Sequence, residues 1–356
     1  MRRRFRDEAR NEVRDQTRAL WEQLMNTTKW PDSADEQAWQ EAATALRGLA
    51  RDRNARTAVR RSPTLAAALE AASRRFVAGA GREDALAVAR DLNQQGILAS
   101  VEFMGEDTTD PGEVDEAVRE FTGLVSAISA SRLRASISLN LSHIGLAVDR
   151  ATAEANCAAI AAAAGAAGVE VVLNMEGDAY RDHILSVHAD LGSRLPGLGI
   201  TLQACLDQTD DDLDRCLELP GRTRLVKGAY DEIQRAAGIR GRSVDERYDR
   251  LAERLLSSDH PCAIATHDPE RLHRAADILG RRSHRAAEFE MLLGVARDRL
   301  DHLNRQGFQT RVYVPYGDDW FLFLCHRVAE HPANLATAIT AMAAQFQRTV
   351  GAPVRR

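Results

Sequence analysis

The sequence predicts an α/β fold, a (β/α)8 barrel that follows a helical segment. Between residues 96 and 316, eight short apolar runs rich in β-branched residues recur, and each is followed by a stretch rich in Ala, Leu, Glu and Arg. Residues 1–92 contain no such run and instead combine good helix formers with apolar positions three and four residues apart. Eight strands that alternate with helices have the number and order of a TIM-like barrel.

The helical segment is expected to form an accessory domain over residues 1–92. It has a break near Pro31, because proline cannot donate a backbone hydrogen bond inside a helix. The barrel is expected over residues 93–340 as the catalytic domain, and residues 341–356 form a C-terminal tail.

The strands of the barrel are predicted from the apolar runs in chain order. They cover residues 96–103, 136–141, 169–175, 200–206, 223–230, 262–267, 288–293 and 310–316. The seventh run suits a helix equally well, because it contains Met and Leu. A doubly wound open sheet remains the structural alternative, although no G-x-G-x-x-G motif supports a Rossmann dinucleotide site.

The composition excludes several classes of function. The net charge of -5 is spread along the 356 residues, and the only basic block is the short Met1–Arg4 start, so we expect no nucleic-acid partner. No run of about 18 apolar residues occurs, so we expect no membrane span. The five cysteines form no C-x-x-C pair, and they are expected to be reduced thiols in a cytoplasmic protein.

Metal and serine-hydrolase chemistry find no motif. The ten histidines show neither H-x-H nor H-E-x-x-H spacing, and the carboxylates lack the spacing of a calcium loop. No G-x-S-x-G elbow is present. We therefore predict no bound metal and no Ser-His-Asp triad.

Polar residues gather where the predicted strands end. They are Glu102, Glu106, Asn140, Asn174, Glu176, Gln203, Arg224, Lys227, Thr266, His267, Glu288 and Tyr313. In a barrel of this kind, active sites lie at the C-terminal ends of the strands. A ligand spread over several strand ends could satisfy many of these groups at once; the alternative is that they pair with each other and with loop backbone.

The fifth run, RLVKGAY at residues 224–230, carries two cations and a glycine. Alternation along a strand places Arg224, Val226 and Gly228 on one face and Lys227 on the other. Gly228 permits close approach of a ligand to the backbone, and a cation beside it suits a diphosphate or a flavin ring that becomes anionic on reduction. The alternative is a surface Arg and Lys that flank a turn.

Several motifs in chain order resemble the proline dehydrogenase family of FAD-dependent barrel enzymes. They are RFVAG at 75–79, VEFMGE at 101–106, RLVKGAY at 224–230, ATH at 265–267, EFEMLLG at 288–294, YVPYGDDW at 313–320 and RVAEHPANL at 327–335. The resemblance extends from about residue 70 to about residue 340, and it implies that the barrel binds FAD.

The resemblance also implies which residues contact the cofactor. The matching positions are Met175, Gln203, Arg224, Lys227, Gly228, Ala229, Thr266, His267 and Glu330. At Lys227, Gly228 and Ala229 it is the backbone that matches. Arg224 matches an arginine near the flavin N5 atom, where hydride arrives, and a fixed cation there would stabilise negative charge on the reduced ring.

The substrate side departs from the family pattern. Asn140 stands in place of a lysine, and His326 and Arg327 in place of an arginine pair, so two of three cations that hold the proline carboxylate are replaced. Further differences are Asn174 for an aspartate, Phe323 for a tyrosine and Glu102 for an aspartate, whereas Glu106 and Tyr313 fit the pattern.

These observations predict an FAD-dependent oxidoreductase that oxidises a C–N bond by hydride transfer to flavin N5. Arg224, Asn174 and Tyr313 are the expected catalytic residues. The expected substrate is a proline-like molecule or another small amine rather than free L-proline, and the electron acceptor is a quinone or dioxygen. The alternatives are an L-proline dehydrogenase that forms 1-pyrroline-5-carboxylate, and a catalytically silent flavin-binding protein. An oligomer is compatible with the sequence.

Overall fold

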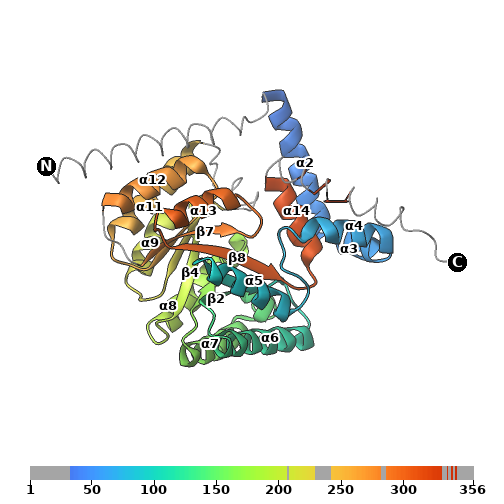
Figure 1. Ribbon diagram of the computed structural model, residues 1–356. Helices are drawn as coiled ribbons and strands as arrows, with labels where there is room; N and C mark the ends of the chain where they lie inside the picture. Colours follow the sequence, from blue (N-terminus) through green and yellow to red (C-terminus); the bar gives the residue numbers. More distant parts are fainter. Residues whose placement is uncertain are drawn as a thin grey trace.

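The computed structural model describes residues 33–206, 208–228, 242–281 and 286–330, together with residues 335, 338, 339, 341 and 342. Its centre is a closed barrel of eight parallel strands in the order β1 to β8 (Figure 1). The strands are β1 (Leu98–Phe103), β2 (Ala135–Leu139), β3 (Val171–Leu173), β4 (Leu198–Gln203), β5 (Thr223–Val226), β6 (Cys262–Ala265), β7 (Ala287–Leu292) and β8 (Thr310–Tyr316). The predicted barrel is thereby confirmed.

Pairing between the first and last strands closes the sheet. β1 pairs with β2 on one side and with β8 on the other, with Ser100 opposite both Ser136 and Tyr313. An open doubly wound sheet has two unpaired edges, so that alternative is wrong. The seventh run forms a strand, because Phe289 and Met291 are buried on the outer face of β7 against the helices.

Four helices precede β1 among the described residues, and from β1 onward helices alternate with the strands. The helices are α2 (Ser33–Arg51), α3 (Arg53–Arg60), α4 (Pro63–Ser73), α5 (Arg82–Gln94), α6 (Pro111–Ala130), the 3-10 turn η1 (Leu141–Ile144), α7 (Arg150–Ala167), α8 (Asp178–Gly192), α9 (Thr209–Leu217), α11 (Arg242–Ser257), α12 (Pro269–Arg281), α13 (Arg297–Arg305) and α14 (Trp320–Glu330). Local sequence explains several boundaries. Asp110 caps α6 by accepting the backbone N–H of Glu113 at 3.0 Å, and Gly168 ends α7 with φ +69.

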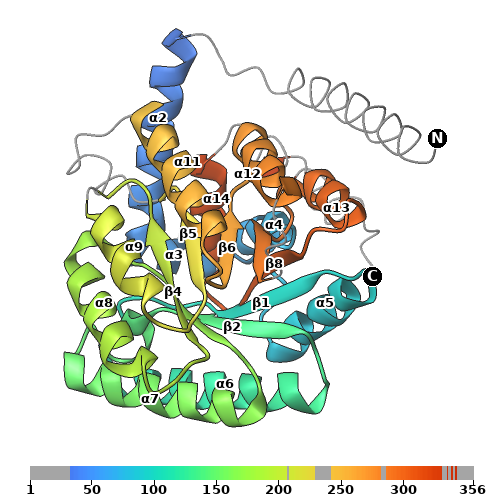
Figure 2. The same cartoon turned by 90° about the vertical axis from the view of Figure 1, so that its left-hand side faces the viewer.

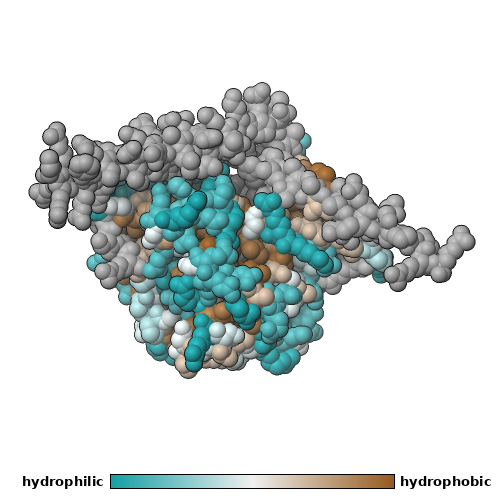
Figure 3. All heavy atoms as spheres, in the orientation of Figure 1, coloured by the Kyte–Doolittle hydropathy of each residue, from teal (hydrophilic) through white to brown (hydrophobic). Residues whose placement is uncertain are grey.

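The main hydrophobic core lies between the outer face of the barrel and these helices. Phe121 of α6, Ile137 of β2 and Tyr248 of α11 belong to it and are fully buried. All five cysteines are buried and have free thiols. On the face seen in Figure 3, hydrophilic side chains cover much of the described surface, with hydrophobic ones showing between them. Among the described helices, none has the length and apolarity needed to cross a membrane.

The N-terminal helices divide into two groups by what they contact. α2 and α4 lie against α14, beside the barrel in Figure 1 and behind it in Figure 2. Phe76, which follows α4, packs with Leu324 and Val328 of α14 in a small separate core. α5 instead packs on β1 and β8, and its Leu86 and Leu92 belong to the main core. α5 thus packs with the barrel, and the domain boundary at residue 92 stays a prediction. The predicted break near Pro31 and most of the predicted tail lie outside the described residues.

Candidate active site

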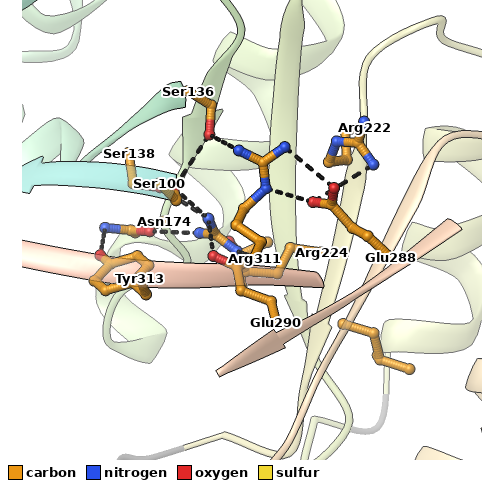
Figure 4. Close-up of polar contacts among 12 residues, drawn as sticks. Ser100, Ser136, Ser138, Asn174, Arg222, Arg224, Glu288, Glu290, Arg311 and Tyr313 are labelled. Atoms are coloured by element: carbon orange, nitrogen blue, oxygen red, sulfur yellow. Dashed lines mark hydrogen bonds and ion pairs between the residues drawn. The ribbon is translucent and has the colours of Figure 1, made fainter. Parts of the chain in front are cut away.

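The interior of the barrel is polar, because polar residues stand at every second position on most strands. These residues are Ser100 and Glu102, Ser136 and Ser138, Thr201 and Gln203, Arg222 and Arg224, Glu288 and Glu290, and Arg311 and Tyr313. The serine, arginine and glutamate side chains among them meet in two layers (Figure 4). The lower layer lies toward the N-terminal ends of the strands, and the upper layer lies toward the C-terminal ends.

Arg311 and Glu288 form the lower layer. Arg311 donates to Glu288 from Nε at 2.6 Å and from Nη2 at 3.1 Å, and it also donates to Ser136 Oγ at 3.0 Å. The prediction that Glu288 joins the other polar residues at the strand ends is wrong. Glu288 is the second residue of β7, so it lies at the opposite end of the barrel, where its charge is balanced by Arg311 and by Arg222 at 3.6 Å.

Arg224 is the centre of the upper layer. Its guanidinium donates to Glu290 from Nε at 2.7 Å and from Nη2 at 2.9 Å, and Nη2 also lies 2.9 Å from Ser100 Oγ and 2.9 Å from Ser138 Oγ. Nη1 donates to Asn174 Oδ1 at 3.2 Å and to a threonine hydroxyl of β4 at 3.3 Å. Arg224 therefore ties five strands and the end of β3 into one network.

Asn174 connects this layer to the strand ends. While its Oδ1 accepts from Arg224, its Nδ2 lies 2.8 Å from Glu102 Oε1, 2.9 Å from Asn140 Oδ1 and 3.0 Å from Tyr313 Oη. Two amide hydrogens serve three acceptors, so one contact is shared. The structure thus brings together five of the residues predicted from the sequence. Asn140, Asn174 and Tyr313 are only partly buried, as expected of side chains that line a binding site.

The protonation states in this cluster follow from burial. Burial raises the pKa of Glu102 to about 7, although the Tyr313 hydrogen bond and the charge of Arg224 oppose the rise. Burial and the negative charge of Glu102 also raise the pKa of Tyr313 well above its ordinary value. Near neutral pH, Tyr313 is therefore a neutral phenol, while Glu102 exists in both protonation states.

Helix α14 brings three predicted substrate residues to the same end of the barrel. Phe323, His326 and Arg327 are at i, i+3 and i+4 on this helix and are all partly buried. The guanidinium of Arg327 lies 4.9 Å from the centroid of the Phe323 ring. The charge of Arg327 lowers the pKa of Glu102, as Arg224 does, and the charge of Glu106 raises it. The charges of Arg327 and Glu106 therefore both act on Glu102, one member of the Asn174 cluster.

The predicted cofactor residues with described side chains lie on β3 to β6 or directly after them. Gln203 Nε2 donates to the backbone carbonyl of Met175 at 3.1 Å, and Thr266 Oγ1 accepts the backbone N–H of Asp268 at 3.1 Å. The Glu330 side chain and all of Ala229 lie outside the described residues. These contacts order the loops after the strands, so that backbone and side-chain donors keep fixed positions.

His267 is a neutral donor. Burial, together with the charges of Arg327 and Arg299, lowers the pKa of His267 to about 3. Its Nε2 accepts the backbone N–H of Leu292 at 3.0 Å, so the ring proton is on Nδ1. Arg299 donates from Nη1 to the His267 carbonyl at 2.6 Å, and its buried Nε finds no acceptor among the described residues.

Lys227 and Gly228 have structural partners that the sequence did not reveal. The ammonium of Lys227 lies 2.5 Å from Asp245 Oδ1 and 2.8 Å from Asp268 Oδ2, so its charge is balanced by two carboxylates rather than held for a ligand. Gly228 has φ +112, and a Cβ there would lie 2.3 Å from Cys205 Sγ. Glycine is required by the packing of this turn, whatever else approaches it.

Glu176 supports the site from the loop side. It accepts the backbone N–H of Ser142 at 3.1 Å and also the Ser142 hydroxyl. Burial raises the pKa of Glu176 to about 7, although the two Ser142 hydrogen bonds oppose the rise. Because Ser142 lies in η1, two residues after Asn140, Glu176 holds the backbone next to that site residue.

Sequence reasoning missed the interior partners of Arg224 and the donor beside His267. They are Ser100, Ser138, Thr201, Glu290 and Arg299. The alternation of polar and apolar residues along the strands was the signal for the first four, since a period of two places them on one face. Arg299 lies on a helix among other charged residues, and no spacing distinguishes it.

Comparisons with known proteins identify the family of this chain. The model of the family described as proline dehydrogenase matches residues 85–337. Proline dehydrogenase 1 of Bacillus subtilis is 33% identical over 266 residues, which cover 74% of this chain and 88% of that protein. The proline dehydrogenase of Deinococcus radiodurans is 30% identical over 278 residues, which cover 75% of this chain and 89% of that protein.

A solved structure shows the same fold at lower identity. Proline utilization A from Bdellovibrio bacteriovorus, inactivated by N-propargylglycine, has a TM-score of 0.68 and 20% identity to this chain. The match covers 73% of this chain and 32% of that one, so this chain spans about a third of its length. Family model, curated relatives and barrel together show that the chain belongs to the proline dehydrogenase family of oxidoreductases.

Proposed function

We propose that this protein is an FAD-dependent oxidoreductase that oxidises the C–N bond of a small amine or a proline-like molecule, and that free L-proline is not its preferred substrate. The contact between Asn140 and Asn174 carries the second part of this proposal. Their amides meet at 2.9 Å, where the resemblance to the family leads one to expect a lysine and an aspartate. A neutral amide pair stands in place of two opposite charges, so the site has lost a cation together with its counter-charge.

The loss of cations weakens recognition of a carboxylate. Of the three cations that the family pattern implies, Arg327 alone remains a formal charge, and Glu102 and Glu106 lie near it. An unpaired carboxylate in a closed site costs several kcal/mol, roughly two or more decades in binding. A substrate whose carboxylate is absent or masked avoids this cost.

The donor set of the site fits FAD. FAD is anionic and rich in hydrogen-bond acceptors. His267 offers a neutral Nδ1–H donor, and Arg299 next to it has an Nε–H without an acceptor among the described residues. Gln203, Thr266 and the backbone around Gly228 would hold the cofactor, with Arg224 near its ring.

The chemistry is a two-electron oxidation. FAD, when bound, supplies a hydride acceptor. The substrate carbon loses a hydride and the nitrogen loses a proton, so the C–N single bond becomes a C=N bond. Glu102 accepts or holds the proton of the amine, while Tyr313 and Asn174 orient the nitrogen. A quinone or dioxygen then takes the two electrons.

L-proline dehydrogenase activity is the alternative. The curated relatives carry that name, and Arg327 still offers one cation for a carboxylate. His326 would have to be protonated to supply a second one. The two functions differ in whether free proline reduces the bound flavin at low concentration.

The visible spectrum of the purified protein tests the cofactor. A flavoprotein absorbs near 450 nm, roughly where free flavin does, and it releases FAD when it is denatured. A colourless protein that does not take up added FAD would contradict the proposal. Mixing the reduced protein with air or with a soluble quinone in a stopped-flow instrument then identifies the acceptor by the faster reoxidation.

Glu102 is expected to give the reaction a pH dependence. Because its pKa is raised to about 7, the carboxylate that receives the amine proton forms only above that pH. We expect kcat/KM to rise through an apparent pKa near 7, and Glu102→Gln to remove this rise and to lower the plateau by roughly tenfold or more. The pH profile of flavin reduction measures both effects.

Glu176→Gln is the matched control, because the pKa of Glu176 is also about 7 but its hydrogen bonds go to Ser142. A raised carboxyl pKa stabilises the fold below the ordinary value of 4.5, and this contribution is lost as the pH rises through 7. Glutamine does not titrate, so both variants lack this loss. Between pH 4.5 and a pH above 7, the free energy of unfolding of each variant should therefore rise relative to that of the natural chain, by up to about 3 kcal/mol. If the two variants change the pH profile of flavin reduction equally, Glu102 is not the group that receives the amine proton.

A further inference from the structure

Two buried arginine–glutamate pairs share strand β7 but lie in different layers. The upper pair joins Arg224 to Glu290, with distances of 2.7 and 2.9 Å and exposures of 4% and 3%. The lower pair joins Arg311 to Glu288 in the same two-bond arrangement. Two parallel hydrogen bonds to a carboxylate fix both the position and the plane of a guanidinium.

Glu290 decides which edge of Arg224 faces the strand ends. It binds Nε and Nη2, and because the five donors of a guanidinium lie in one rigid plane, Nη1 is then directed to the opposite side. Nη1 meets Asn174, whose amide contacts Glu102 and Tyr313. With Glu290 removed, the guanidinium could turn toward other oxygen atoms of the interior.

Glu290 also offsets the charge of Arg224. Its carboxylate lies within hydrogen-bond distance of the guanidinium, whereas the other acceptors, Ser100, Ser138 and Asn174, are neutral. The pair therefore presents aligned N–H donors to the strand ends with little net charge. Since the interior is buried, water does little to screen a change in this balance.

We propose that Glu290 is a positioning residue of the active site, which directs Nη1 of Arg224 at Asn174 and sets the charge that the strand ends experience. The predicted effect on the flavin rests on the proposed function, and the predicted effect on Glu102 does not. It predicts that Glu290 and Glu288, which are equally buried members of similar pairs, differ sharply in what they control.

The experiment compares Glu290→Gln with Glu288→Gln in the full chain saturated with FAD. Glutamine keeps the size of the side chain but removes its charge. Both variants are expected to unfold at a lower temperature. In Glu290→Gln alone, the midpoint potential of the flavin should become more positive, because the unbalanced Arg224 favours a ring that gains negative charge on reduction. Glu290→Asp, which keeps the charge but withdraws the carboxylate, should leave the potential near its original value and slow flavin reduction several-fold.

A second measurement does not depend on the flavin. In the cofactor-free chain, carbon-13 NMR of the glutamate carboxyl groups follows the titration of Glu102. Burial raises its pKa to about 7, and the charge of Arg224 opposes this rise. Glu290→Gln leaves the charge of Arg224 unbalanced and should lower the pKa of Glu102 below about 7, whereas Glu288→Gln should leave it almost unchanged. Equal shifts in both variants, or none in either, would overturn the role of Glu290. Failure of the natural chain to bind FAD would instead overturn the proposed function.

Discussion

Replacing Arg224 with lysine is expected to slow reduction of the bound flavin by about a hundredfold or more. Lysine keeps the charge but has three donors on one atom, so it cannot bind Glu290 with two parallel bonds and also reach Asn174 at the strand ends. Both the orientation of the amide network and the donor near the flavin are lost. Anaerobic stopped-flow absorbance with a substrate that reduces the natural chain measures the rate.

Arg311→Lys is the control for this variant. Arg311 forms the equivalent buried pair with Glu288, so lysine there disturbs the fold in a similar way without touching Asn174. We expect Arg311→Lys to lower the unfolding temperature and to leave the rate of flavin reduction within a few-fold of the original. Equal rates for the Arg224 and Arg311 variants would mean that the upper layer only stabilises the barrel.

Restoring both charges at the amide pair is expected to have the second large effect. Asn140→Lys alone places a cation against the amide of Asn174, which already accepts from Arg224. Asn174→Asp alone places an anion beside Glu102. Each single variant should therefore bind substrates poorly. The double variant can form an ion pair at this position, and we expect its apparent KM for L-proline to fall by about tenfold or more below that of the natural chain.

A double-mutant cycle measures this coupling from kcat/KM for L-proline. The expected interaction energy is about 1–3 kcal/mol, because the two side chains are in direct contact. Asn304→Asp serves as the control, since Asn304 lies on α13 and its amide bonds the backbone of Gln95, away from the site. Additive single effects, or an unchanged KM in the double variant, would show that the amide pair does not limit the use of proline.

The barrel could be predicted because its strands are buried on their outer faces by helices. Runs such as VEVVLNM at 169–175 carry enough β-branched and apolar residues to be recognised. The boundaries were less certain. The sequence predicts a seventh strand that begins at Glu288, whereas β7 begins at Ala287, and the prediction that Glu288 lies at the C-terminal strand end is wrong.

The sequence predicts which residues meet at the strand ends, but it does not predict which charged residues pair with each other. Strand ends of a barrel converge, so Asn140, Asn174 and Tyr313 were expected to meet, and they do. The partners of Lys227 come from residues 245 and 268, on separate elements that only the folded chain brings beside it. No local pattern reveals ion pairs between residues so far apart in the sequence. The sequence therefore favours an anion-binding role for Lys227, although two carboxylates balance its charge.

Anaerobic titration of the FAD-bound protein with matched cyclic amines tests the central claim most directly. L-Proline, its methyl ester and pyrrolidine share one ring and differ only in whether a free, masked or absent carboxylate is present. The account predicts that a compound without a free carboxylate bleaches the flavin band near 450 nm at a concentration at least roughly tenfold below that of L-proline. Complete bleaching by L-proline at the lowest concentration of the three would contradict it and would identify an ordinary proline dehydrogenase.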